Sequence, residues 1–262
     1  MTRLLSGVAL AAAAIAAIVF LPVIGVRVLA SIVAVLAAHE YLRIIAIESG
    51  SLQRLRSANP APILLIVAVT CWYLVLPAPQ VVLALLLIGV AWVVIEVLFA
   101  GLPIEDASSR FVAQWYIGMP LGMLVGVRGS KGWPATLLLL ATVVVSDTAQ
   151  YYAGRSFGRR PLAPAISPKK TIEGAIGGLV VATLFMALVG PRILPGAAPL
   201  PLAGLGLTIA VLGMCGDLFE SRLKRDAGVK DSSTLIPGHG GVLDRIDALL
   251  FAIPAYYLYL RP

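Results

Sequence analysis

A segment of charged, hydroxyl and glycine residues runs from Ser221 to Asp247 in a chain that is otherwise strongly apolar. Asp217, four residues before this segment, is followed by Ser221 and Lys224 at positions i+4 and i+7. In a helix, this spacing places a carboxylate, a hydroxyl and an ammonium group on one face. Such a face, where an apolar helix ends, is a candidate binding site for a charged ligand.

The loop after this face resembles a phosphate-binding turn. Its charged residues are Arg225, Lys230 and Asp231. The run 237–241, Pro-Gly-His-Gly-Gly, permits positive φ angles and a close backbone approach, which N–H groups need in order to contact phosphate oxygens. Directly afterwards, Asp244, Arg245 and Asp247 begin the last apolar stretch. His239 fits a structural hydrogen bond as well as a phosphate contact or proton role, and both remain open.

The donor types in this segment favour Mg²⁺ over zinc. Hard carboxylate oxygens without cysteine or paired histidine suit Mg²⁺, which binds through one or two carboxylates plus substrate phosphates. Together the residues indicate phosphoryl or nucleotidyl transfer, in which a protein mainly positions groups and neutralises charge. The chain has no GxxxxGK[ST] loop, which disfavours a P-loop ATPase.

A second polar segment covers residues 146–178. Asp147 lies near the end of an apolar stretch, where a carboxylate must face protein, water or a metal. The sequence does not decide between a metal ligand, a base-contacting residue and a helix-packing group. Lys169 and Lys170 precede a further helix, where the macrodipole disfavours cations. The lysine pair therefore predicts an anionic ligand, with an interfacial anchor as the alternative.

The elements that must position these groups are membrane-spanning helices. The chain is 60% hydrophobic and 13% charged, against about 25% charged residues in soluble domains, and its mean hydropathy is +0.96. We expect an all-α polytopic membrane protein with about nine spans. The apolar runs lie at about 4–20, 23–47, 61–77, 80–100, 109–127, 132–153, 171–190, 201–220 and 242–260.

The distribution of basic residues predicts the orientation. Lys and Arg concentrate on the cytoplasmic side of membrane proteins. With the N-terminus inside and the C-terminus outside, only five of the 20 basic residues remain outside: Arg27, Arg128, Lys131, Arg192 and Arg261. Both long charged loops then face the cytoplasm, where the active site is expected.

We expect residues 1–262 to form a single integral membrane domain. Residues 1–130 would be mainly a lipid-embedded scaffold and residues 131–262 the catalytic half. The first apolar run could serve as a signal peptide, but an uncleaved helix is the simpler interpretation. Cys71 and Cys215 are predicted to be core residues without a disulfide, and Glu96 to be a packing group rather than part of a lipid cavity.

The two polar segments closely resemble the phosphatidate cytidylyltransferases, also called CDP-diacylglycerol synthases. The most specific match is Ser221-x-Leu223-Lys224-Arg225-x4-Lys230-Asp231, followed by Pro237-x-His239-Gly240-Gly241-x2-Asp244-Arg245-x-Asp247. Further matches are Ser146-Asp147 through Gly154-Arg155, Ser167-Pro168-Lys169-Lys170-Thr171-x-Glu173-Gly174, Gly177-Gly178 and Glu40-Tyr41. Two residues depart from the family pattern: Ala248 stands where a serine often follows the final aspartate, and Gln150 replaces a usually small residue.

The resemblance implies that CTP and phosphatidic acid react to give CDP-diacylglycerol and pyrophosphate at the cytoplasmic side of a bacterial inner membrane. It also implies a homodimer with a funnel-shaped cavity open to lipid and cytoplasm, Mg²⁺ dependence and no nucleic-acid partner. The number of bound ions, and whether a monovalent cation such as K⁺ assists, stay open.

The roles expected on this basis fall into two groups. Asp217 and Asp244 would bind the metal, with Asp247 as a further ligand or orienting group. The remaining expected substrate contacts are Lys224, Arg225, Lys230, Arg245, Lys169, Lys170, Ser167, Ser221, Asp231, His239, Gly240, Gly241 and Asp147.

Two other functions remain. A CTP-dependent polyprenol or dolichol kinase would transfer the γ-phosphate to an alcohol and release CDP. A transporter of anionic substrates would be expected to show inverted repeats with broken helices near the bilayer midplane. The polar residues of this chain instead gather at the ends of spans in the second half.

Overall fold

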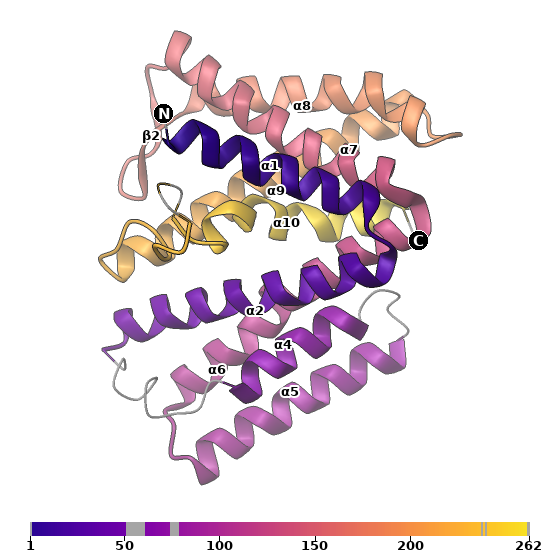
Figure 1. Cartoon of the computed structure of the whole chain (residues 1–262). Helices are drawn as coiled ribbons and strands as arrows, with labels where there is room; N and C mark the ends of the chain where they lie inside the picture. Colours follow the sequence, from indigo (N-terminus) through magenta and orange to yellow (C-terminus); the bar gives the residue numbers. More distant parts are fainter. Residues whose placement is uncertain (1, 51–60, 74–78, 237, 239, 261–262) are drawn as a thin grey trace. The chain divides into compact units, whose positions relative to one another are not determined.

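The computed structural model of the chain describes residues 2–50, 61–73, 79–236, 238 and 240–260, and it is almost entirely helical (Figure 1). Its helices are α1 (Thr2–Phe20), α2 (Val23–Glu48), α4 (Ala61–Tyr73), α5 (Pro79–Phe99), α6 (Ile104–Ala113), the π-helix η1 (Gln114–Gly118), α7 (Met119–Phe157), α8 (Ile172–Ile193), α9 (Pro199–Asp226) and α10 (Leu243–Leu260). Strands β1 (Pro161–Ala163) and β2 (Ser167–Thr171) pair in an antiparallel hairpin.

Five helical stretches within the described residues are long and apolar enough to cross a membrane. They are Val23–Glu48, Gln80–Phe99, Ile104–Phe157, Ile172–Ile193 and Pro199–Asp226. Two shorter apolar helices cover Gly7–Phe20 and Ile63–Trp72. The length and apolar character of these helices are consistent with the predicted all-α membrane protein. The number of nine spans and the orientation stay predictions.

One helical stretch covers two of the predicted spans. The runs 109–127 and 132–153 both lie within Ile104–Phe157, but Gly132 has φ 80° and ψ 178°, which is not helical. A positive φ of this kind suits glycine, because it has no Cβ to clash with the backbone. The break between the two predicted runs is therefore at Gly132.

The chain divides into two compact units. The first unit consists of Met1–Gly129 and Leu223–Arg245, and the second of Ser130–Arg222 and Ile246–Pro262. Helices α7, α9 and α10 each contribute residues to both units. The expected single domain, with a scaffold at 1–130 and a catalytic half at 131–262, stays a prediction.

In the first unit, α2 packs against α4, and several small side chains of α2 are buried. Ala34, Ala37 and Ala38 are completely buried, which lets neighbouring helices approach closely. The buried Glu96 of α5 and Arg110 of α6 form an ion pair with 2.5 Å between Oε1 and Nη1. Each charge is thus neutralised within the protein, in agreement with the packing interpretation of Glu96.

In the second unit, glycines of α8 face α7. A Cβ on Gly178 would collide with the Gln150 side chain and lie 2.9 Å from the Ser146 carbonyl oxygen, and one on Gly174 would lie 2.7 Å from the Gln150 carbonyl oxygen. These contacts bring α8, and with it the end of the hairpin, directly against the polar end of α7.

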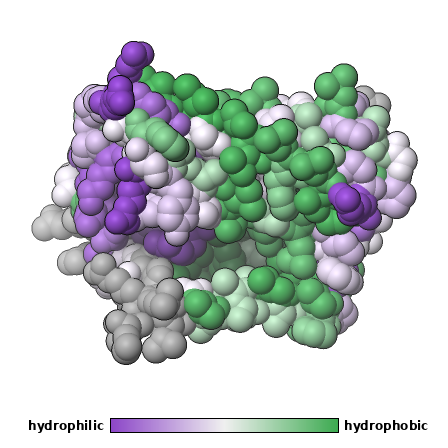
Figure 2. All heavy atoms as spheres, turned by 90° about the horizontal axis from the view of Figure 1, so that it is seen from above, coloured by the Kyte–Doolittle hydropathy of each residue, from purple (hydrophilic) through white to green (hydrophobic). Residues whose placement is uncertain are grey.

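Apolar side chains remain exposed on the second unit. Ile176, Val180, Leu184 and Leu188 recur every four residues along α8 and are 51–64% exposed. Figure 2 shows hydrophobic residues over much of the visible surface. Exposed apolar helix faces of this extent suit lipid as their surroundings.

The two cysteines differ in burial. Both are free, as expected, and Cys71 is completely buried. Cys215 is exposed, so its predicted place in the core is wrong. The apolar surroundings of Cys215 in the sequence do not distinguish a residue that faces lipid from one that faces protein, because both environments are apolar.

We expect Gly178→Ala to destabilise the second unit by about 1–3 kcal/mol, because the added methyl group meets Gln150 and the α7 backbone. The matched control is Gly204→Ala in α9, where a Cβ meets nothing within 4 Å. There the change should be neutral or stabilise by up to about 1 kcal/mol. Thermal unfolding in detergent measures both, and equal midpoints for the two variants would contradict the close α7–α8 packing.

Candidate functional site

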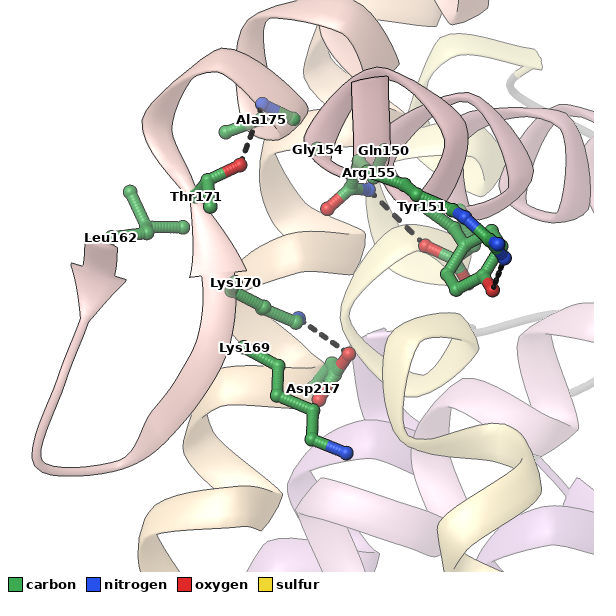
Figure 3. A pocket seen from close by; sticks show the side chains of 12 residues that line it. Gln150, Tyr151, Gly154, Arg155, Leu162, Lys169, Lys170, Thr171, Ala175 and Asp217 are labelled. Atoms are coloured by element: carbon green, nitrogen blue, oxygen red, sulfur yellow. Dashed lines mark hydrogen bonds and ion pairs between the residues drawn. The ribbon is translucent and has the colours of Figure 1, made fainter. Parts of the chain in front are cut away.

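A pocket of about 400 Å³ lies in the second unit (Figure 3). It is bounded by the end of α7, the β1–β2 hairpin, the start of α8 and a position on α9. Its lining residues are Asp147, Gln150, Tyr151, Gly154, Arg155, Leu162, Lys169, Lys170, Thr171, Gly174, Ala175 and Asp217. The lining thus contains two carboxylates and three cationic side chains.

The hairpin that carries the two lysines is fixed where it joins α8. Thr171 caps this helix, because its Oγ1 accepts a hydrogen bond from the Gly174 N–H at 3.1 Å. Glu173 Oε2 accepts hydrogen bonds from the N–H groups of Arg159 and Arg160 at 3.0 and 3.2 Å. Glu173 also lies in the first helical turn, where the macrodipole favours a negative charge.

Lys170 and Asp217 form the central ion pair of the pocket. Lys170 Nζ lies 2.5 Å from Asp217 Oδ2, and Ser221 Oγ donates to Asp217 Oδ1 at 3.2 Å. The Lys170 side chain is 22% exposed and that of Asp217 is 34% exposed. Both groups are therefore within reach of a ligand that enters the pocket.

Lys169 extends from the hairpin toward the same side of the pocket (Figure 3). Among the described residues, no hydrogen bond or ion pair engages the Lys169 ammonium group, so this group can meet an anion without first leaving a partner.

The end of α7 contributes the opposite wall. Gln150 Nε2 donates to Asp147 Oδ1 at 3.2 Å and to Ser146 Oγ at 3.3 Å. Arg155 Nη1 donates to Tyr151 Oη at 3.1 Å. The amide of Gln150 thus orients Asp147, which lies about one turn back on the same helix.

In the first unit, Asp244 is held by a lysine and a loop. Lys224 Nζ lies 2.6 Å from Asp244 Oδ1. Asp244 Oδ2 accepts hydrogen bonds from the Ser232 N–H at 2.9 Å, the Ser232 hydroxyl at 2.8 Å and the Gly241 N–H at 2.7 Å. Gly240 has φ +78°, and a Cβ there would collide with this carboxylate. Gly240 and Gly241 therefore lie directly against the Asp244 carboxylate.

The remaining predicted site residues within the described part of the chain do not line the pocket. Arg225 Nη1 donates to the Val229 carbonyl oxygen at 3.4 Å. Lys230 and Asp231 are exposed, and Arg245 lies in the first turn of α10, next to Asp244. Asp247 Oδ1 accepts the Ala248 N–H at 2.8 Å. Ser167 begins β2 but does not line the pocket, and His239 lies outside the described residues.

The three predicted metal ligands are divided between the units. Asp217 and Asp247 belong to the second unit and Asp244 to the first. Within the described part of the chain, no three His, Cys, Asp or Glu side chains gather as a ready-made metal site. The ligand set stays a prediction, and a metal at the pocket would need oxygen atoms from its substrate.

Sequence reasoning missed several residues that line the pocket or support the loop. Gln150 appeared only as a departure from a family pattern, although its distance of three residues from Asp147 could have indicated the contact. Tyr151 was not missed, because its spacing of four residues from Asp147 predicted that the two share a polar helical face, and both line the pocket. Arg155 lies one turn further on the same face. Glu40 in α2 accepts hydrogen bonds from the loop of the first unit, and no local spacing could have shown this.

Comparison with known proteins gives consistent matches. The model of the family described as "Cytidylyltransferase family" matches residues 1–262. Phosphatidate cytidylyltransferase of Pseudomonas aeruginosa is 38% identical over 188 residues, which cover 68% of this chain and 69% of that protein. The enzyme of the same name from Bacillus subtilis is 38% identical over 161 residues, covering 60% and 59%.

The uncharacterized protein YnbB of Escherichia coli K12 is 42% identical over 149 residues, covering 57% of this chain and 48% of that protein. The chain thus spans between about half and seven tenths of the length of the curated relatives described here.

We expect Lys170→Ala to weaken binding of inorganic triphosphate to the pocket by about tenfold, because a charge-assisted hydrogen bond is lost and Asp217 is left unneutralised. Lys131→Ala is the matched control, since it removes the same charge from an exposed position of the second unit outside the pocket. Titration calorimetry in detergent compares the two. Binding within twofold of wild type for Lys170→Ala would show that triphosphate does not use this ion pair.

Proposed function

This chain belongs to the cytidylyltransferase family, and we propose that it transfers the cytidylyl group of CTP to phosphatidic acid, giving CDP-diacylglycerol and pyrophosphate. The names of its relatives from Pseudomonas aeruginosa and Bacillus subtilis support this choice of substrates. The observation that carries the proposal is the Lys170–Asp217 pair in a pocket that also contains Asp147, Lys169 and Arg155.

The pocket has the charges that a nucleoside triphosphate requires. Lys169, Lys170 and Arg155 offer cationic donors for phosphate oxygens, and the Lys170 ammonium can exchange Asp217 for a phosphate at little cost in geometry. The hairpin and the capped start of α8 hold the lysines in place. The protein would thus contribute mainly position and charge, which is what phosphoryl-group transfer demands.

The donors in the pocket fit Mg²⁺. Asp147 and Asp217 provide carboxylate oxygens, and Ser221 adds a hydroxyl beside Asp217. Two carboxylates plus substrate phosphates suffice for this ion. When bound, Mg²⁺ would offset the charge that develops on the α-phosphate and on departing pyrophosphate. Asp217, Asp244 and Asp247 remain the proposed ligands, with a second cation such as K⁺ as a further proposal.

The proposed reaction needs no activated side-chain nucleophile. An oxygen of the phosphatidic acid phosphate attacks the α-phosphorus of CTP, a new P–O–P bond forms, and the bond between the α-phosphorus and the bridging oxygen of the β-phosphate breaks. Pyrophosphate leaves with the electron pair of that bond. Lys169 and Lys170 would hold the triphosphate, and the proposed phosphate contacts of the first unit are Lys224, Arg225, Lys230 and Arg245.

Location and assembly are proposed on the same basis. We place the chain in a bacterial inner membrane with nine spans, the N-terminus inside and the active site facing the cytoplasm, where CTP is made. The asymmetry of Lys and Arg supports this orientation. Membrane lipids and a second copy of the chain in a homodimer are the proposed partners.

The first test is pyrophosphate release by the detergent-purified chain given CTP, Mg²⁺ and phosphatidic acid, with undecaprenol or dolichol in a parallel reaction. We expect pyrophosphate with phosphatidic acid alone. CDP formed with the alcohol would instead identify a lipid kinase, and no product in either reaction would contradict both enzymes.

Asp217→Asn and Asp244→Asn should each lower turnover by about 100-fold or more while the protein stays folded, because each removes a charge from a proposed site group. Glu105→Gln, at an exposed position of α6, is the control and should retain wild-type turnover. Near-normal activity of either aspartate variant would refute its proposed metal role.

Removal of divalent metal should abolish turnover, since the negative charges of two carboxylates and a triphosphate exceed the three positive charges of the pocket, and a divalent cation would offset the excess. We expect excess EDTA to stop CDP-diacylglycerol formation and added Mg²⁺ to restore it. Full activity in EDTA, measured with radiolabelled CTP, would exclude an essential exchangeable divalent cation.

A further inference from the structure

We propose that Glu40 of α2 is a positioning residue for the reaction, which acts by fixing Ser232, Ser233 and the start of α10, where Asp244 lies. This inference rests on the proposed cytidylyl transfer for its functional consequence, whereas the contacts themselves are independent of it. Glu40 has no predicted role beyond its place in a short sequence match.

The carboxylate of Glu40 is buried, with 4% of the residue exposed, and it accepts four hydrogen bonds. Oε1 accepts from the Ser233 hydroxyl at 2.7 Å and from the Val242 N–H at 3.1 Å. Oε2 accepts from the Ser232 hydroxyl at 2.9 Å and from the Leu243 N–H at 2.8 Å. All four donors come from one short segment, about 200 positions further along the chain.

These hydrogen bonds satisfy both the buried carboxylate of Glu40 and the backbone N–H groups at the start of α10. An isolated carboxylate in an apolar interior is strongly disfavoured unless hydrogen bonds replace its water. The N–H groups of Val242 and Leu243 lie where α10 begins, and the first N–H groups of a helix lack partners within the helix. Glu40 satisfies both of these donors and places a negative charge at the positive end of the helix.

Ser232 connects Glu40 to Asp244. Its Oγ lies 2.9 Å from Glu40 Oε2 and 2.8 Å from Asp244 Oδ2, so the single hydroxyl proton serves one carboxylate at a time. A Cβ on Gly241 would collide with both Glu40 and the Ser232 hydroxyl. The two carboxylates therefore converge on one serine and one glycine, and little free space remains between them.

The position of Asp244, and through it that of Lys224, thus depends on Glu40. Asp244 Oδ2 is bound by the N–H groups of Ser232 and Gly241, both next to atoms that Glu40 contacts. Lys224 Nζ is in turn paired with Asp244 at 2.6 Å. A displacement of about 1 Å in a reacting group can lower a rate about 100-fold, so a small shift of this segment is sufficient to impair turnover.

The test is Glu40→Gln, which keeps the side-chain shape but replaces one acceptor oxygen by an NH₂ donor facing other donors. We expect kcat to fall about tenfold or more, the KM for CTP to change less than about threefold, and the folded fraction to match wild type. Hydrogen exchange should show the amides of Val242 and Leu243 exchanging about tenfold faster or more. Glu48→Gln, at an exposed position on the same helix, is the matched control and should change neither kcat nor the exchange rates of the two amides.

Several outcomes would overturn the proposal. These are a kcat within twofold of wild type, unchanged exchange at both amides, or an equal loss of kcat in Glu48→Gln. If Glu40→Gln does not fold, Ser233→Ala is the deciding variant, because it removes one hydrogen-bond donor from Glu40 Oε1. We expect kcat of Ser233→Ala to fall about threefold, and an unchanged kcat would refute the positioning role. A wild-type chain that forms no CDP-diacylglycerol refutes the proposed function, whereas active wild type with an equally active Glu40→Gln refutes the positioning role alone.

Discussion

Each ionised side chain inside this apolar chain must be neutralised or fully hydrogen-bonded, and this constraint accounts for most of its polar structure. Glu96 and Arg110 neutralise each other at exposures of 6% and 5%, and Lys224 and Asp244 do so at 11% and 7%. Lys170 and Asp217 are more open, at 22% and 34%. The Glu96–Arg110 pair suits a structural role, since breaking it would leave an uncompensated buried charge, and the open Lys170–Asp217 pair suits ligand exchange.

The backbone meets the same constraint at helix starts. At the start of α8, Thr171 caps the helix, and Glu173 in the first turn accepts hydrogen bonds from backbone N–H groups just before β1. At the start of α10, Glu40 accepts hydrogen bonds from two backbone N–H groups. Close glycine contacts then set the distance between α7 and α8. The pocket lysines are therefore placed by ordinary capping and packing rather than by contacts among themselves.

Sequence alone predicted the family, the helical membrane character and the site segments, because these depend on composition, periodicity and a long motif. The spacing of Asp217 and Ser221 predicted that they share one helical face, and the structure joins them by a hydrogen bond of 3.2 Å. Lys224 shares their spacing but pairs with Asp244, 20 positions on. Helical periodicity predicts which face of a helix a residue occupies, but it does not predict which distant segment of the chain contacts that face. The same limit hid Glu40, whose four donors lie about 200 positions away.

An irregular register in the β1–β2 hairpin lets two consecutive lysines line the same pocket. Pro161 pairs with Thr171 and Ala163 with Ser167, and the register shifts between these two pairs, as it does at a β-bulge. In a regular strand, neighbouring side chains point to opposite sides, so one of two adjacent lysines would turn away from the pocket. Here Lys170 pairs with Asp217, and Lys169, which is more exposed, lines the pocket as well. The departure from the regular pleat thus allows one short strand to present two adjacent cations to a single anion.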